Sequence, residues 1–213
     1  TIMLKFDEKK LVDRINGALK LRPQVEEVVD RLWDSGLRNI CFMGIGGTYA
    51  SALDAVTAML ESTEQEVYSV NAAEYNTTGH HRLGKGTLVV ISSVTGSTAE
   101  MIDAVNRLHE AGAYVLGFID NAEAPLADTC ITFAGEEQMK FSMVVDRLLW
   151  HEGKFADYDR FYDQMEQYLA EDLVAVEKQA DAFGRAFAEK HVDDPLHYYV
   201  GAGALFGITY SYA

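Results

Sequence analysis

Short apolar runs alternate with amphipathic helical patterns between residues 39 and 134, and this alternation constrains the fold more than any other feature of the sequence. The runs are rich in β-branched residues and bounded by turn-forming residues, which is typical of buried strands. Between them, apolar residues recur three and four positions apart, which is typical of helices. Elements that alternate in this way form a parallel sheet with helices on both faces and right-handed crossovers. We therefore expect an α/β fold with strands at 39–43, 66–70, 88–91, 113–119 and 130–134.

A turn rich in hydroxyl residues follows the third of these strands, and a helical pattern follows the turn. The turn reads Ser92-Ser-Val-Thr-Gly-Ser-Thr98. Ser97 and Glu100 fit a capping box, so we expect Ser97 to be the N-cap of the helix. A helix N-terminus presents unpaired N–H groups and the positive end of the helix dipole, which favours a bound phosphate. No Lys or Arg lies between Thr87 and Met101, so the pattern predicts a neutral phosphate site, and it fits equally well a capped helix without a ligand.

A glycine-rich turn, Gly44-Ile-Gly-Gly-Thr-Tyr-Ala-Ser51, follows the first strand and also leads into a helical pattern. The dinucleotide-binding fingerprint fails here because Tyr49 stands where its third glycine belongs, and a P-loop lysine is also missing. The turn is therefore either a second phosphate cradle without nucleotide specificity or a tight turn that needs glycine for its backbone. Ligands of parallel sheets bind at the carboxyl ends of the strands. If the two strands are neighbours, both turns face one pocket.

The composition excludes some classes of partner. The chain has 213 residues, of which 48% are hydrophobic, and this is enough for one α/β domain with extra elements. Its net charge of −15 disfavours binding to nucleic acid and to anionic membrane surfaces. We expect neither a nucleic-acid nor a membrane partner. We expect no signal peptide, and no apolar run is long enough to span a bilayer, so a cytoplasmic location is expected.

Cysteine and histidine residues do not form a metal-binding pattern. Cys41 and Cys130 lie in predicted strands, so we expect buried reduced thiols. His80 and His81 lie in a polar loop without a companion ligand at suitable spacing, and a solvated pair is the simpler interpretation. Glu74, His80 and His81 remain weak candidates for contacts with a ligand near the mouth of the pocket.

The flanking regions are predicted to be mostly helical. Pro23 suits the start of a helix, and Gly36 suits its end. The region 137–190 is helical and acidic, with an aromatic stripe typical of a core or a dimer interface: Tyr158, Phe161, Tyr162, Met165 and Tyr168. The stretch 197–206 repeats the theme of an apolar strand, a glycine turn and the start of a helix.

The pairing of Gly44–Ser51 with Ser92–Thr98 resembles the sugar isomerase (SIS) domain. The mark of that family is a Ser-x-Ser/Thr-Gly-x-Thr turn, which here reads Ser93-Val-Thr-Gly-Ser-Thr98. The resemblance implies a three-layer α-β-α sandwich around a parallel, flavodoxin-like sheet that binds phosphosugars. It divides the chain into a helical segment at 1–38, an SIS domain at 39–150, a helical connector at 151–196 and the start of a second SIS domain, cut short, at 197–213.

The same resemblance implies the residues of a substrate site. Side chains and backbone amides of the hydroxyl turn would bind the sugar phosphate, and the glycine turn would contact the sugar. Thr48 corresponds to the hydroxyl residue after the family's first glycine turn. The phosphate set is Ser93, Val94, Thr95, Gly96, Ser97 and Thr98, and the sugar set is Gly46, Gly47 and Thr48.

Within the family, the chain looks most similar to two-domain enzymes: fructosamine-6-phosphate (fructoselysine-6-phosphate) deglycases and the isomerase half of glucosamine-6-phosphate synthase. The sequence shows no cysteine-nucleophile glutaminase domain, so we expect a deglycase that releases glucose 6-phosphate and an amine or amino acid. A phosphosugar aldose–ketose isomerase or a glucosamine-6-phosphate synthase-type isomerase is the first alternative, and a non-catalytic phosphosugar-sensing module is the second. The resemblance implies acid–base chemistry without a metal or redox cofactor, and a homodimer or higher homo-oligomer. The family's catalytic residues lie in the second SIS domain, so no catalytic residue is assigned.

Overall fold

A parallel five-stranded sheet forms the centre of the protein, with the strand order β2-β1-β3-β4-β5. The computed structural model describes residues 7–60, 62–127, 130–132 and 137–212. The order is that of flavodoxin-like sheets, so the predicted α/β sandwich is confirmed. The strands are β1 (Asn39–Gly44), β2 (Glu66–Asn71), β3 (Thr87–Ser93), β4 (Tyr114–Ile119) and β5 (Cys130–Thr132). Residues 133 and 134 of the last predicted strand lie outside the described residues.

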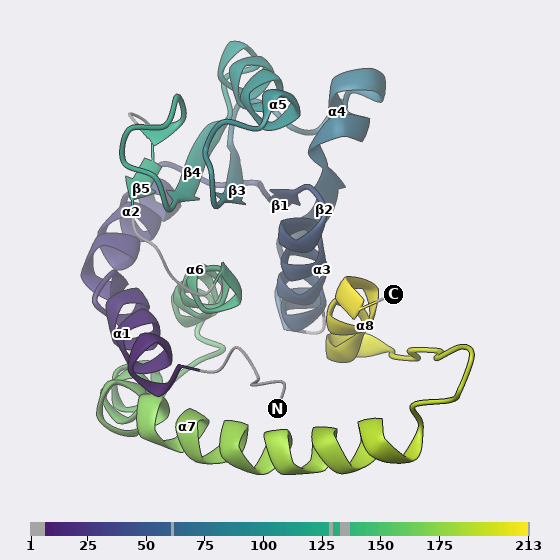
Figure 1. Ribbon diagram of the computed structural model, residues 1–213. Coiled ribbons are helices and arrows are strands. Elements are labelled where there is room, and N and C mark those ends of the chain that lie inside the picture. Colours follow the sequence, from purple (N-terminus) through teal and green to yellow (C-terminus); the bar gives the residue numbers. More distant parts are fainter. Residues whose placement is uncertain (1–6, 61, 128–129, 133–136, 213) are drawn as a thin grey trace.

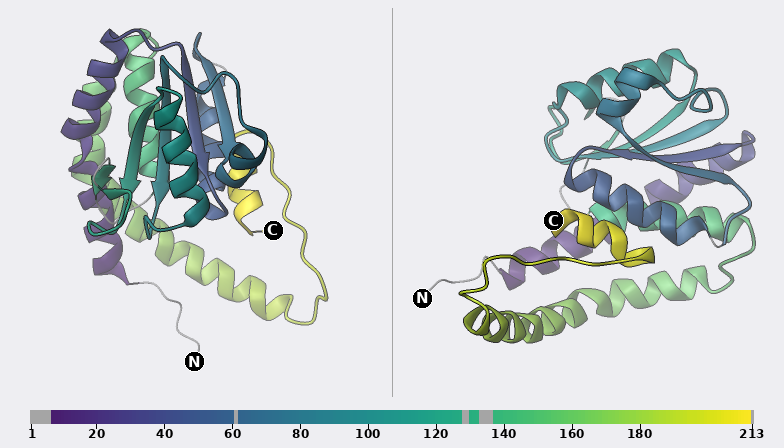
Figure 2. Two further views of the ribbon diagram at one scale, coloured as in Figure 1. Left: turned by 90° about the horizontal axis from the view of Figure 1, so that it is seen from above. Right: turned by 90° about the vertical axis from the view of Figure 1, so that its right-hand side faces the viewer.

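Helices cover both faces of the sheet (Figure 1). On one side lie α4 (Ala72–Thr78) and α5 (Ala99–Glu110). On the other side lie α2 (Arg22–Asp34), α3 (Gly47–Leu60) and α6 (Glu137–His151), and α1 (Glu8–Leu19) continues this layer. Figure 2 shows the long helix α7 (Tyr158–Lys190) as an outer layer beneath these helices.

The strands form because their side chains are buried on both faces. Every residue of β3 is buried. Leu88 and Val90 belong to the core beneath α3 and α6, whereas Val89 and Ile91 belong to the core beneath α4 and α5. A strand buried on both faces reads as a continuous apolar run, which is the pattern seen in the sequence.

The helix after the hydroxyl turn begins one residue later than predicted. Its N-cap is Thr98, with φ −64° and ψ 120°, so the prediction of Ser97 as N-cap was wrong. The carbonyl of Thr98 accepts hydrogen bonds from the N–H groups of Met101 and Ile102, both at 3.0 Å. The Ser97 N–H donates instead to Oγ1 of Thr95 at 3.3 Å, which keeps Ser97 inside the turn. Glu100 therefore stands at the second helical position, where it cannot close a capping box.

The apolar stretch near the C-terminus is not a strand. Residues 196–202 have no regular secondary structure in the described chain, so the predicted strand after His197 was wrong. Val200 is 94% exposed, and this segment is paired with none of the strands in the described part of the chain. The predicted turn and helix are present as a 3₁₀ helix at Gly203–Leu205 and α8 (Phe206–Tyr212). The N–H of Gly207 donates to Oδ1 of Asp54 at 3.0 Å, which joins α8 to α3.

Other predictions about the core have mixed outcomes. Cys41 is a buried free thiol, as expected, and burial raises its pKa, whereas the side chain of Cys130 lies outside the described residues. In the aromatic stripe of α7, Tyr158 and Tyr162 are buried, but Phe161 and Tyr168 are exposed. Among the described residues, no helix is both long enough and apolar enough to cross a membrane.

Candidate functional site

The glycine turn and the hydroxyl turn lie next to each other at the carboxyl edge of the sheet. β1 and β3 are paired in parallel, with Met43 opposite Ile91, so Gly44 and Ser92 lie side by side where the two strands end. β2 continues the sheet on one side of this pair and β4 on the other. The chain therefore changes direction of winding between β1 and β3, which is where parallel sheets bind ligands. The strands are neighbours, as the hypothesis of one shared pocket required.

Hydrogen bonds from backbone N–H groups to its own hydroxyl groups shape the hydroxyl turn. The Gly96 N–H donates to Oγ of the buried Ser93 at 3.0 Å. Gly96 has φ +62°, and a Cβ atom at this position would lie 2.5 Å from both the Ala124 and the Ile119 side chains. Only glycine fits both the backbone conformation and the space. The turn is thus held closely against the end of β4.

The outer part of the turn is accessible. Val94, Thr95 and Ser97 are exposed, and Thr98 is half-buried and makes no capping hydrogen bond with its side chain. The first N–H groups of α5 lie beyond Thr98 and have no partners within the helix. This edge combines hydroxyl groups, amide donors and a positive helix dipole without a cationic side chain in the turn, which suits a phosphate group.

The glycine turn brings the start of α3 to the same edge. A Cβ atom on Gly44 would lie 2.4 Å from the backbone of Thr48, so glycine is required for the close approach. Gly46 has φ +58°. Thr48 Oγ1 accepts a hydrogen bond from the Ile45 N–H and donates one to the Ile45 carbonyl, both at 3.0 Å. Its hydroxyl group therefore stabilises the turn, while exposed Gly46 and Gly47 leave backbone groups accessible.

Sequence reasoning missed an ion pair beside the hydroxyl turn. Nζ of the fully buried Lys140 lies 3.1 Å from Oδ1 of Asp120, which follows the last residue of β4. The Asp120 N–H donates to the Ser93 carbonyl at 3.4 Å. In the sequence, Lys140 stands four residues before Val144 and therefore lies on the same face of the helix as this buried residue. That signal is weak, because an isolated lysine in a helix is usually solvated.

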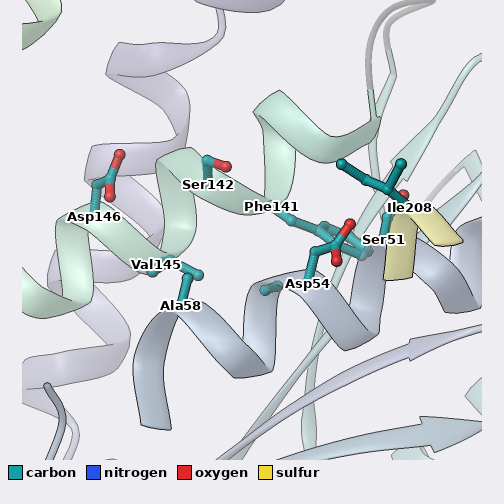
Figure 3. Close-up of a pocket in the computed structure, with 9 residues that line it drawn as sticks. Ser51, Asp54, Ala58, Phe141, Ser142, Val145, Asp146 and Ile208 are labelled. Carbon is teal, nitrogen blue, oxygen red and sulfur yellow. The ribbon is translucent and has the colours of Figure 1, made fainter. Parts of the chain in front are cut away.

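A cavity of about 240 Å³ lies between α3, α6 and α8. Figure 3 shows Ser51, Asp54 and Ile208 near one end of it and Asp146 at the other. Burial raises the pKa of both carboxyl groups, and the Tyr162 hydroxyl donates a hydrogen bond to Asp146 at 2.7 Å. Ser51 lies one helical turn after Gly47, so the cavity opens beneath the glycine turn but is not lined by the hydroxyl turn.

The structure does not bring the weaker candidates to the two turns. Glu74 and His80 line a groove of about 420 Å³ along β2, which is the edge strand on the far side of β1. The rings of His80 and His81 stack with centres 5.8 Å apart. Among the described residues, no group of His, Cys, Asp or Glu side chains could hold a metal ion.

Comparison with known sequences gives a family match and a distant relative. The model of the SIS domain matches residues 32–148. Fructosamine deglycase FrlB of Bacillus subtilis (strain 168) is 23% identical over 208 residues, which cover 91% of this chain and 62% of that protein. The chain therefore spans less than two thirds of the length of this relative.

Comparison with solved structures supports the fold. A candidate phosphosugar isomerase from Bacillus subtilis superposes with a TM-score of 0.74 and 19% identity, covering 96% of this chain and 64% of that chain. The C-terminal domain of glucosamine-fructose-6-phosphate aminotransferase from Francisella tularensis superposes with a TM-score of 0.73 and 12% identity, covering 97% and 65% of the two chains. At these identities the likeness concerns the fold alone.

Proposed function

This chain belongs to the SIS domain family, and we propose that it binds a phosphorylated sugar at the carboxyl edge between β1 and β3. The observation that carries the proposal is the convergence of two unrelated turns on this edge. Either turn alone is explained by the needs of its own backbone. Together, next to each other at the point where strand order reverses, they form a surface rich in donors at the usual ligand position of a parallel sheet.

Each turn has a separate role in the proposal. The hydroxyl turn, Ser93 to Thr98, binds the phosphate through hydroxyl groups and backbone amides. The glycine turn, through Gly46, Gly47 and Thr48, contacts the sugar. Hydrogen bonds to a charged acceptor are stronger than neutral ones, so neutral donors are sufficient to hold a phosphate dianion.

We further propose that the protein acts in an enzyme of phosphosugar metabolism, with fructosamine 6-phosphate deglycation as the first reaction to test. The similarity to FrlB supports this choice. The reaction transfers a proton between adjacent sugar carbons and hydrolyses an imine with one water, which yields glucose 6-phosphate and a free amine. A general acid–base group is sufficient for it. No residue of this chain is assigned that catalytic role.

Aldose–ketose isomerisation of a phosphosugar is the second candidate. The superposition on a tagatose-6-phosphate ketose/aldose isomerase candidate from Clostridium novyi, at a TM-score of 0.64, favours testing it. Both reactions move a proton between neighbouring carbons of a sugar phosphate. They differ in whether an amine is released, so a coupled assay for the amine separates them. Release of neither amine nor isomer, with retained binding, would favour a sensing module.

The binding proposal is tested by thermal unfolding with fructose 6-phosphate, glucose 6-phosphate and the sugars without phosphate. A ligand at a hundredfold excess over its Kd stabilises a protein by about 2.7 kcal/mol, which raises the Tm of a chain of this size by several degrees. We expect this shift with the phosphosugars only, and we expect Thr98→Ala to reduce it. Thr57→Ala is the matched control, because Thr57 lies within α3 and its hydroxyl donates to the Leu53 carbonyl. Equal shifts with fructose and fructose 6-phosphate would contradict the proposed phosphate site.

The expected homo-oligomer remains a prediction. Its measurement is light scattering of the purified chain over a range of concentrations, with and without fructose 6-phosphate. A mass of one chain at all concentrations would contradict it.

A further inference from the structure

The buried ion pair beside the hydroxyl turn is unusual in its position. Lys140 is completely buried on α6, and its Nζ atom lies 5.7 Å from the centre of the Phe118 ring as well as 3.1 Å from Asp120. Burial of an ammonium group costs free energy, and an apolar residue of similar size would avoid that cost. The position of this lysine is therefore not explained by packing alone.

Asp120 is the member of the pair that a ligand can reach. Its side chain is 17% exposed, whereas that of Lys140 is completely buried. The hydrogen bond from its N–H to the Ser93 carbonyl fixes it beside the proposed phosphate site. Lys140 comes from the opposite direction, on α6, and holds the carboxylate in place.

Ser92 provides a second, independent observation at the same place. It is 1% exposed, and its Oγ atom has no hydrogen-bond partner among the residues that the structure describes. Ser92 stands opposite Phe118 in the register of β3 and β4, so both side chains point to the face covered by α6. A buried hydroxyl group without a partner is costly, and it indicates a polar group that is still to be bound.

We propose that Asp120 accepts hydrogen bonds from hydroxyl groups of the sugar portion, and that Lys140 is a positioning residue that orients and neutralises Asp120. This inference rests on the proposed phosphosugar site and extends it towards α6. A carboxylate accepts hydrogen bonds from adjacent hydroxyl groups, which every sugar carries. Without Lys140, the negative charge of Asp120 would repel the phosphate dianion at the neighbouring turn.

The experiment compares two ligands, because the proposal gives Asp120 a role with the sugar and not with the phosphate. Calorimetric titrations of the chain use fructose 6-phosphate and inorganic phosphate. For Asp120→Asn we expect an affinity for fructose 6-phosphate that is about tenfold lower, since a charged acceptor is replaced by a neutral one. The affinity for inorganic phosphate should stay equal to or above that of the wild type.

A double variant separates positioning from a general structural effect. Lys140→Met leaves the charge of Asp120 uncompensated, so it should weaken the binding of both ligands. Adding Asp120→Asn to Lys140→Met removes that charge and should restore the binding of inorganic phosphate, while the binding of fructose 6-phosphate stays weak. Loss of packing alone would not be reversed by the second substitution.

Asp30→Asn is the matched control. Asp30 pairs with Arg147 near the other end of α6, with both oxygen–nitrogen distances at 2.7 Å. The Asp30→Asn variant should have a lower free energy of unfolding, but the ratio of its affinities for fructose 6-phosphate and inorganic phosphate should not change. If Asp120→Asn leaves both affinities unchanged or lowers both equally, the inference is overturned while the proposed function stands. If the wild type binds no phosphosugar, both fail.

Discussion

At the scale of the residue, Gly96 decides whether the hydroxyl turn can exist. Its φ of +62° lies in the left-handed region, and its Cα faces the Ile119 and Ala124 side chains. The turn can close against the end of β4 only because a side chain is absent. The glycine at this position of the sequence motif is therefore required for a steric reason.

We predict that Gly96→Ala lowers the free energy of unfolding by about 1–3 kcal/mol, because the new methyl group meets two side chains in a strained backbone conformation. Chemical denaturation measures this change. Gly36→Ala is the control: Gly36 also has a positive φ, but nothing lies within 4 Å of its Cβ position. A cost for Gly96→Ala no larger than that of the control would refute the steric argument.

The lowered pKa of Asp30 predicts that the protein loses stability in acid. Hydrogen bonds from Arg147, and then from His151, hold the pKa of the Asp30 carboxyl group below its usual range. The contribution of the ionised Asp30 to the free energy of unfolding is therefore fully present above the unfolded pKa of about 3.9. It is lost as the pH falls through the lower pKa of the folded state. Denaturation curves between pH 6 and pH 2 should fall less steeply for Asp30→Asn than for the wild type. Parallel curves would disprove the linkage.

The raised pKa of Asp146 predicts the opposite dependence of stability on pH. Burial raises the pKa of its carboxyl group, although the Tyr162 hydroxyl donates to it. The folded protein then binds this proton more tightly than the unfolded chain does. The stabilising contribution of the protonated Asp146 is therefore fully present below about pH 3.9 and is lost as the pH rises through the pKa of the folded state. Asp146→Asn should lose less stability than the wild type between pH 4 and pH 7. A larger loss for the variant in that range would contradict this assignment.

At the scale of the element, α7 consists of two parts with different burial. Tyr158, Tyr162, Ala170 and Val174 are buried against the rest of the protein, whereas no residue from 175 to 190 is buried. The second part therefore depends on helix propensity, on side-chain pairs within the helix such as Arg185 with Asp181, and on surface contacts such as the ion pair of Lys178 with Glu8 of α1. Isolated helical segments of this length are marginal in water.

We predict that amide hydrogens of 175–190 exchange much faster than those of 162–174, because opening the second part exposes little apolar surface. Hydrogen exchange followed by mass spectrometry measures the difference. As a matched pair of substitutions, Val174→Ala should cost about 1–2 kcal/mol and Phe183→Ala, at a side chain that is 74% exposed, close to nothing. Uniform protection along α7 would show that another surface covers its second part.

At the scale of the whole molecule, the net charge of −15 opposes the approach of a phosphosugar. The proposed site contains few cations, so the long-range field is repulsive while the local contacts are attractive. This is the reverse of a nucleic-acid site, in which long-range attraction dominates.

The predicted consequence is an unusual dependence on salt. The Debye length shortens to about 10 Å at 0.1 M salt, which screens distant charges more than contacts within the site. The Kd for fructose 6-phosphate should therefore fall or stay constant as NaCl rises from about 20 to 200 mM. Titration calorimetry in a weakly interacting buffer measures it. A Kd that rises severalfold would indicate a cationic site and contradict the neutral turn.

The sequence by itself determined the strands of the sheet and the chemistry of each turn, because both depend on neighbouring residues. The continuous apolar run of β3 required burial on two faces, and Gly96 with its surrounding hydroxyl residues specified the turn. The exact start of α5 was mispredicted, since Ser97 and Thr98 both carry hydroxyl groups that can cap a helix, and in the structure the Ser97 N–H donates to Thr95 while Thr98 is the N-cap.

Only the tertiary structure decided what lies next to what. The pairing of β1 with β3 placed Gly44 beside Ser92, although 48 positions separate them in the sequence. The apolar stretch around Val200 has the pattern of a strand, but among the described residues it has no neighbouring strand with which to pair. The contact between Lys140 and Asp120 likewise depends on the packing of α6 against β4. Such contacts join distant parts of the chain, and their free energy comes from burial and charge pairing that no local pattern of residues records.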